Sequence, residues 1–198
     1  MKADWVNKFE KEGTYKETFT DINGDESEID FMHQAADFKY YENGDTKAVK
    51  LPYENGLSMV VVLGDTKNIL NDIHNNKMTS KLVDVSLPKF KAEYSIDYVN
   101  ILKNMGIEKA FDNQNADFSL MLENYPERIK IDSVLQKAMI DVDEKGTEAA
   151  AATVAVVPKS ALSVDEEVIE FRADKPFTYY VLDDSGNVYF AGRYVKAE

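Results

Sequence analysis

Cysteine is absent from this 198-residue sequence. The chain therefore has no disulfide, no thiolate nucleophile and no cysteine-ligated metal. Histidine is scarce, since only His33 and His74 occur. The sequence predicts that both are polar surface residues rather than a metal site or a catalytic base. We therefore expect no metal and no cofactor.

Long apolar segments are also missing. No run of roughly 18 apolar residues occurs, and the stretch "MKADWVNKFEKEG" lacks the apolar centre of a secretory signal, so neither a membrane span nor a leader is expected in this chain. Basic residues are outnumbered, 23 against 36 acidic ones, which gives a net charge of -13. Because this charge repels phosphates and anionic lipids, neither nucleic acid nor a membrane is an expected partner.

Sequence motifs for catalysis are absent as well. There is no glycine-rich phosphate loop, nucleophile elbow or zinc-binding helix motif. The stretch "DINGDESEID" from Asp21 resembles a calcium loop, but its sixth and twelfth positions are Glu26 and Met32 where such a loop needs Gly and Glu. A hairpin turn explains this stretch better, and the sequence does not support an enzyme.

Turn and strand signals dominate what is present. The pairs Asn23-Gly24, Asn43-Gly44 and Asn55-Gly56 predict hairpins, because both residue types tolerate positive φ. The segments between them predict separate strands "EIDFMHQ", "FKYYE", "KAVKLPY" and "LSMVVVL", the last buried on both faces. "FTYYVL" and "VYFAGRYV" predict a further hairpin, with Gly186 in its turn.

Fewer segments have helical periodicity. Residues 66–76 and 95–105 are predicted helices, the second with a Ser95 cap and a stop at Gly106. The strand "LVDVSLPKFKAEY" lies between them, and Pro88 indicates an edge or a bend. "IDSVLQK" is predicted to be a short helical piece, and "AMIDVDE" is predicted to be a half-buried strand.

The tract "GTEAAAAT", from Gly146 to Thr153, is compatible with two structures. Alanine favours a helix, which Thr147 would cap. As a strand, the tract would instead carry Thr147, Ala149 and Ala151 on one uniformly small face, with the charge of Glu148 on the other. Such a strand would fit between two existing strands, with Gly146 as its hinge.

The residues around this tract resemble the serpins, the serine-protease inhibitor family. "IDSVLQKAMIDVDEKGTEAAAAT" is similar to the serpin hinge region. Further blocks follow the family's order: "KAVKLPYENGLSMVVVL", "LPKFKAEYSIDYVNILKNMGIEKAF", "NADFS" and "FRADKPFTYYVLDDSGNVYFAGRYV". The resemblance covers the C-terminal half of a serpin. It implies an α+β serpin-type fold with sheets B and C, part of sheet A and few helices, in one domain over residues 1–198.

The resemblance also implies functional residues. Residues 144–166 would be the hinge and reactive-centre loop, which a serine protease cleaves and which then inserts into the main sheet. Lys159-Ser160 suits a trypsin-like protease, whereas the family's spacing from the hinge glycine favours Ser160-Ala161. The hinge would comprise Glu144, Gly146, Thr147, Glu148, Ala149, Ala150, Ala151, Ala152 and Thr153. Trp5 and Lys89 would lie at the breach, the upper end of the main sheet.

Two departures and one alternative accompany the resemblance. Gln136 replaces a common histidine beneath the strands that open, and Gly64 replaces a common proline, which we expect only to loosen a turn. Lys89 and Glu144 should form a surface ion pair worth about 0 to 1 kcal/mol. Alternatively, the chain has no inhibitory power and binds a complementary N-terminal serpin fragment or a second copy of itself. The resemblance implies an extracellular protein.

Overall fold

The computed structural model describes residues 3–121, 129–147 and 168–197. The chain divides into two compact units, one of Met1–Lys91 with Asp141–Glu198 and one of Ala92–Ile140. Within the described residues, no helix has the length and apolarity needed to cross a bilayer.

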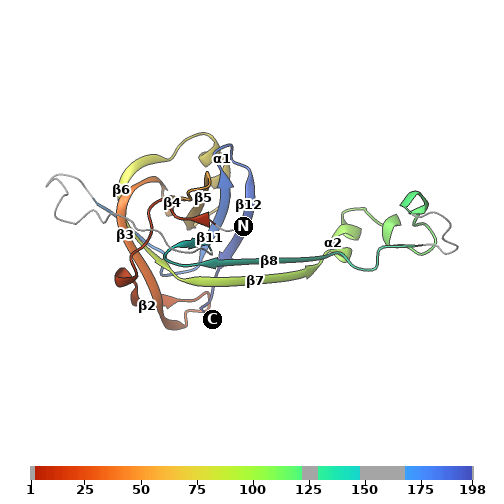
Figure 1. The fold of residues 1–198 in the computed structure, drawn as a ribbon, viewed down its shortest axis with the longest axis horizontal. Coiled ribbons are helices and arrows are strands. Elements are labelled where there is room, and N and C mark those ends of the chain that lie inside the picture. The colour runs from red at the N-terminus through yellow and green to blue at the C-terminus, as the bar shows by residue number, and fades with distance from the viewer. Residues whose placement is uncertain (1–2, 122–128, 148–167, 198) are drawn as a thin grey trace. The chain divides into compact units, whose positions relative to one another are not determined.

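An eight-stranded sheet forms most of the first unit (Figure 1). Its strands, in spatial order, are β10-β6-β3-β4-β5-β11-β12, and β2 pairs with β3 beside this path. All neighbours are antiparallel except β10 and β6. The bounds are β2 Tyr15–Thr20, β3 Glu26–Asn43, β4 Thr46–Pro52, β5 Leu57–Leu63, β6 Thr79–Pro88, β10 Ile169–Arg172, β11 Phe177–Asp183 and β12 Val188–Tyr194. The unit also contains β1 Ala3–Asp4, η1 Lys11–Gly13, α1 Ile69–His74 and β9 Gly146–Thr147.

The predicted hairpins are confirmed. Turns with Gly24, Gly44 and Gly56 at positive φ join β2 to β3, β3 to β4 and β4 to β5. In the first turn, Asp21 Oδ1 accepts hydrogen bonds from the backbone N–H groups of Asn23 and Asp25, at 2.7 and 3.0 Å. This carboxylate thus organises the turn, in agreement with the interpretation of "DINGDESEID" as a hairpin.

Strand β3 corrects one prediction. "EIDFMHQ" and "FKYYE" were expected to be separate strands, but both belong to this single strand of 18 residues. It continues through Ala35 and Ala36 because β6 pairs with it without a break from Phe31 to Tyr40. The intervening small residues therefore do not interrupt the backbone ladder.

The core lies on both faces of the central strands. Residues Ser58 to Val62 of β5 are all buried, as the sequence predicts. The phenol of Tyr41, which belongs to the same buried cluster as Val60 and Val62, donates to Asp72 Oδ2 at 2.5 Å and ties α1 to the sheet. Asp72 Oδ1 also accepts a hydrogen bond from Lys77 at 2.8 Å. Helix α1 lies inside the range 66–76 expected from the sequence, but is shorter than it.

The second unit is built around a two-stranded sheet of β7 Phe90–Asp97 and β8 Leu135–Val142. It also contains α2 Val99–Asn104, η2 Lys109–Phe111 and η3 Ser119–Met121. The stretch "LVDVSLPKFKAEY" was expected to be one strand with an edge or a bend at Pro88, but it is divided between β6 and β7 at Lys89.

Two helix predictions fail in this unit. The predicted Ser95 cap is wrong, because Ser95 remains in β7 and Asp97 Oδ1 accepts the N–H of Val99 at the helix start. The predicted helical piece 131–137 is also wrong. Asp97 Oδ1 and the N–H of Tyr98 bind the backbone of Val134 and hold it extended, and the chain then enters β8.

Candidate functional site

The predicted hinge begins with a tight turn after β8. Oδ1 of Asp143 accepts hydrogen bonds from the backbone N–H groups of Lys145 and Gly146, at 2.9 and 3.1 Å. The N–H of Asp143 donates to the carbonyl of Gly146 at 3.0 Å. A short aspartate side chain is well suited to such a turn, because it binds its own following backbone. The turn reverses the chain direction.

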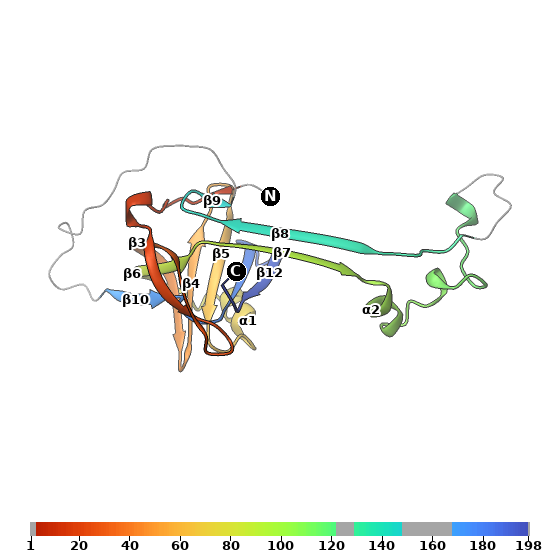
Figure 2. The same cartoon turned by 90° about the horizontal axis from the view of Figure 1, so that it is seen from below.

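Strand β9 then lies between Asp143 and β1. Gly146 pairs antiparallel with Asp143, while Gly146 and Thr147 pair antiparallel with Asp4 and Ala3 (Figure 2). The predicted helix cap at Thr147 is therefore wrong, since this residue is in a strand. β9 is the part of the tract "GTEAAAAT" that lies within the described residues.

Gly146 is required at this position. Its φ is 146°, a conformation that favours glycine, and a Cβ there would overlap the carbonyl oxygen of Ala3. The backbones of β1 and β9 therefore approach each other in a way that no side chain permits.

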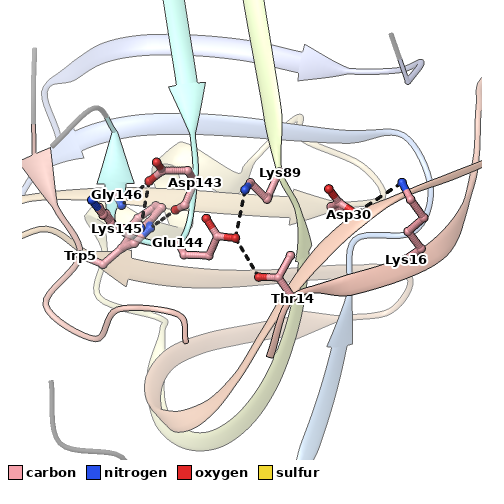
Figure 3. Close-up of polar contacts among 9 residues, drawn as sticks. All are labelled: Trp5, Thr14, Lys16, Asp30, Lys89, Asp143, Glu144, Lys145 and Gly146. Atoms are coloured by element: carbon pink, nitrogen blue, oxygen red, sulfur yellow. Dashed lines mark hydrogen bonds and ion pairs between the residues drawn. The ribbon is translucent and has the colours of Figure 1, made fainter. Parts of the chain in front are cut away.

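Trp5 closes the other side of the turn. Its indole Nε1 donates to the carbonyl of Asp143, and its backbone N–H donates to the carbonyl of Lys145, both at 2.9 Å (Figure 3). The indole is 1% exposed and stacks on Tyr53 with 4.2 Å between centroids and 11° between planes. Phe9 meets its edge at 6.2 Å. The tryptophan thus fixes the hinge turn to the start of the chain.

Glu144 is the charged centre of the turn. Oε1 accepts hydrogen bonds from Lys89 Nζ at 3.0 Å and from Thr14 Oγ1 at 2.9 Å (Figure 3). The predicted ion pair is present, but the expectation of a surface pair is wrong, because the side chain of Glu144 is only 8% exposed. The carbonyl of Glu144 also accepts the N–H of Phe9 at 3.0 Å.

Electrostatics favours the ionised form of Glu144. Burial by itself would raise the pKa of this carboxyl, but its own backbone N–H and the side chains of Lys89 and Thr14 together hold the pKa below its usual value. Lys89 reaches the carboxylate from the break between β6 and β7, where its backbone N–H donates to the carbonyl of Asp30 at 2.8 Å. Three separate segments therefore meet at one buried negative charge.

The rest of the predicted site lies outside the described residues. This applies to the candidate reactive residues Lys159, Ser160 and Ala161. It applies equally to Glu148, Ala149, Ala150, Ala151, Ala152 and Thr153 of the hinge. The structure therefore brings together Trp5, Lys89, Glu144, Gly146 and Thr147.

Gln136 and Gly64, which depart from the serpin pattern, lie in different surroundings. Gln136 lies in β8 and is exposed. Gly64 does not merely loosen a turn, as we had expected. Its φ is +86°, and a Cβ would lie 2.5 Å from the carbonyl oxygen of Asp45, so the turn requires glycine and excludes the proline, whose φ is negative.

Sequence analysis missed Thr14 and Tyr53, because nothing in the local pattern links them to residues far along the chain. The prediction for His33 was also wrong. Its side chain is 14% exposed, stacks on Tyr15 with centroids 4.1 Å apart and lies 3.3 Å from Ser86 Oγ. His74 is exposed, as predicted. Among the residues with a described position, no group of three or more His, Asp or Glu could hold a metal.

Comparison with known proteins gives a consistent result. Residues 1–197 match the family model described as Serpin (serine protease inhibitor). The chain is 35% identical to an uncharacterized serpin-like protein of Thermococcus kodakarensis, over 98% of this chain and 47% of that protein. It is 31% identical to Serpin B11 of Mus musculus, over 99% of this chain and 53% of that protein.

Solved structures agree. Serpin48 of the insect Tenebrio molitor superposes with a TM-score of 0.78 at 32% identity, covering 100% of this chain and 54% of that one. The thermophilic serpin Tengpin in its native state gives 0.80 at 29% identity, covering 98% and 53%. The chain thus spans about half the length of the relatives it matches and has the α+β fold of a serpin's C-terminal portion. It belongs to the serpin family.

Proposed function

We propose that this chain supplies the bait loop and part of the receiving sheet of a serpin-type serine protease inhibitor. Residues 144–166 act as hinge and reactive-centre loop. A protease serine attacks the scissile carbonyl, and the acylated loop inserts into the main sheet before hydrolysis completes. The inserted strand displaces and distorts the bound protease, which makes the inhibition a kinetic trap.

The direction of β9 is the observation that carries this proposal. Gly146 and Thr147 pair antiparallel with β1 on one side, and Gly146 also pairs antiparallel with Asp143 on the other. Gly146 therefore begins a strand with a neighbour on each side, and Thr147 continues this strand along β1. Extension of this strand by the small residues that follow would be the insertion step.

The hinge geometry supports the same proposal. The turn is held by the side chain of Asp143, by Trp5 and by the contact of Glu144 with Lys89. A fixed turn gives the inserting segment a defined start and register, because a one-residue slip would exchange the two faces of the strand. The uniformly small face of the tract would then meet no steric obstacle.

Specificity depends on which bond is cleaved. Cleavage at Lys159-Ser160 suits a trypsin-like protease with an acidic pocket, and cleavage at Ser160-Ala161 suits an elastase-like protease with a small pocket. We propose Lys159 as the residue before the bond. The test is to incubate the protein with trypsin and with elastase, and to analyse the products by denaturing gel and mass spectrometry.

If the protein inhibits by this mechanism, it forms a covalent complex with the protease that stays intact on a denaturing gel. The expected complex forms with trypsin and is lost in Lys159→Ala, while the mass of the released C-terminal peptide identifies the cleaved bond. Clean cleavage of the loop with full recovery of protease activity would contradict the proposal.

A pair of variants tests insertion itself. Thr147→Arg places a charge on the uniformly small face, whereas Glu148→Arg places the same side chain on the opposite face. We expect Thr147→Arg to turn the inhibitor into a substrate and Glu148→Arg to retain the complex. Equal behaviour of the two variants would contradict insertion as a two-faced strand.

A second candidate is an assembly module without inhibitory power. Among the described residues, β7 and β8 pair only with each other, and unpaired strand edges favour association. The expected result is a dimer, or a complex with a complementary N-terminal serpin fragment, in light scattering after size exclusion. A monodisperse monomer that does not bind the fragment would contradict this candidate function.

A further inference from the structure

A polar cluster crosses three neighbouring strands of the eight-stranded sheet. His33 of β3 is the register partner of Ser86 of β6, and Ser86 is the partner of Arg172 of β10. Directly opposed residues share a face of a sheet, so these three side chains form one row. Glu17 of β2 joins them: Oε2 accepts a hydrogen bond from Arg172 Nη2 at 2.5 Å, and Oε1 lies 3.6 Å from His33 Nε2. We call these four residues the Glu17 cluster.

The Glu17 cluster helps to attach strand β10 to the rest of the sheet. Within the described part of the chain, β10 is an edge strand with β6 as its one ladder neighbour (Figure 2), and it begins at Ile169, just after residues 148–167 in the sequence. After the strand, the N–H of Ala173 donates to the carbonyl of Ser86 and the N–H of Thr20 donates to the carbonyl of Asp174. Through the contact of Glu17 with Arg172, the Glu17 cluster also links β10 to β2, a strand that does not pair with β10.

The cluster carries excess negative charge when His33 is neutral. Asp84 and Glu170 are register partners two residues before Ser86 and Arg172 in β6 and β10, so they lie on the same face as the row. With Glu17 they make three carboxylates, and Arg172 is the only permanent cation among these groups. The net charge is therefore -2 with neutral His33 and -1 with the imidazolium.

Other charged groups around the cluster have smaller effects. Asp174 interacts electrostatically with Arg172, whose pKa is raised mainly by its hydrogen bond to Glu17. On η1, which also packs against β3, Lys11 and Glu12 are exposed. Solvent and salt screen exposed charges, so their influence on His33 is weak.

The immediate surroundings of His33 favour a strong coupling. The side chains of His33 and Glu17 are 14% and 15% exposed, and the ring of Tyr15 covers the imidazole in a parallel stack. Because screening is weak between half-buried groups, a change in the charge of His33 acts directly on Glu17. Glu17 in turn holds Arg172 of β10.

We propose that His33 makes the attachment of β10 dependent on pH. Protonation adds a cation beside Glu17, reduces the repulsion among the carboxylates and strengthens the tie between β10 and β2. As the pH rises through the titration range of an imidazole, this contribution is lost and the edge strand loosens. This pH dependence does not require inhibitory activity, because it concerns the attachment of the strand and not the protease.

Hydrogen exchange of the unmodified protein tests the proposal. Amides of residues 168–174 should exchange about fivefold more slowly at about pH 5.5 than at about pH 7.5, after correction for intrinsic rates; this ratio corresponds to an ion pair at the strong end of the exposed range. The peptide 177–183 of β11 should show no such difference. A corrected rate for 168–174 that is independent of pH would overturn the proposal.

The two histidines of the sequence provide a matched pair of variants. His33→Gln should abolish the pH difference in 168–174, and His74→Gln, at an exposed position of α1, should retain it. Retention in His33→Gln, or loss in His74→Gln, would overturn the proposal. A measurement that needs no variant is the NMR titration of the His33 ring, whose midpoint should coincide with that of the exchange of 168–174. Different midpoints would also overturn it.

Discussion

Replacement of Glu144 by glutamine should destabilise the protein by about 1.5 kcal/mol at neutral pH. The side chain keeps its size and loses its charge, while Lys89 and Thr14 still face it at about hydrogen-bond distance. A hydrogen bond to a charged group contributes about 1.5–3 kcal/mol and a neutral one about 0.5–1.5 kcal/mol. The loss therefore comes from converting the bond from Thr14 into a neutral one and from removing the ion-pair attraction of Lys89, whose ammonium stays charged.

Solvent exposure of Lys89 reduces the contribution of its bond to the stabilisation by Glu144. The side chain of Lys89 is 37% exposed, so solvent screens its interaction with Glu144 and we assign it about 0.5 kcal/mol. Glu144 itself is 8% exposed, so the bond from Thr14 retains its full difference of about 1 kcal/mol. These two amounts give the predicted loss.

Urea unfolding followed by tryptophan fluorescence measures this loss. Trp5 is the only tryptophan, and its indole binds the carbonyl of Asp143 next to Glu144, so it reports on the same turn. The control is Asp30→Asn. It breaks the ion pair of Asp30 with Lys16, which is 3.4 Å long with both side chains more than half exposed (Figure 3), and exposed pairs are worth about 0–1 kcal/mol.

The contribution of Glu144 to stability changes with pH in a definite direction. Because the folded protein lowers the pKa of Glu144, its contribution is complete above the pKa of the unfolded chain, about 4.3, and disappears as the pH falls through the folded value. The difference between the unmodified protein and Glu144→Gln should therefore be constant from pH 7 to about pH 5 and shrink on further acidification. An equal loss in Glu144→Gln and Asp30→Asn, or a loss that is constant down to about pH 3, would refute the reasoning.

Three further substitutions have predictable effects. Trp5→Phe removes the bond to Asp143 and part of the aromatic contact, so the midpoint of urea unfolding, followed by circular dichroism, should fall by an amount that corresponds to about 3 kcal/mol. Gly146→Ala forces a methyl group onto the carbonyl of Ala3, and calorimetry should show a loss of at least about 2 kcal/mol; an unchanged melting temperature would contradict the close approach of β1 and β9. Gly64→Ala should cost about 1–3 kcal/mol in the same assay, and a stabilising effect would contradict the positive φ.

The local turns were predictable because their chemistry is local. Each Asn-Gly pair supplies positive φ within the turn that needs it, and all three turns join antiparallel strands. The residues of the hinge turn are different. Trp5 and Asp143 are 138 positions apart, so no spacing rule connects them. Trp5 was identified only through the resemblance to a family, and Asp143 was not predicted as a site residue.

The failed predictions share a physical cause. "IDSVLQK" has helical periodicity, but pairing of β8 with β7 and the bonds from Asp97 and Tyr98 to Val134 make an extended backbone more favourable. His33 was predicted to be a surface residue because histidine is polar. Its place between Tyr15 and Ser86 depends on the register of β3 with two other strands, which the sequence does not reveal.

The length of β3 has a consequence for how homologous chains can vary. This strand pairs with β2, β6 and β4 in turn, so its alternation sets the inner and outer faces for all three. Inserting or deleting one residue within it would move every later side chain to the opposite face. Changes in length among homologues should therefore accumulate in the turns around Gly24 and Gly44, and β3 itself should keep a constant number of residues.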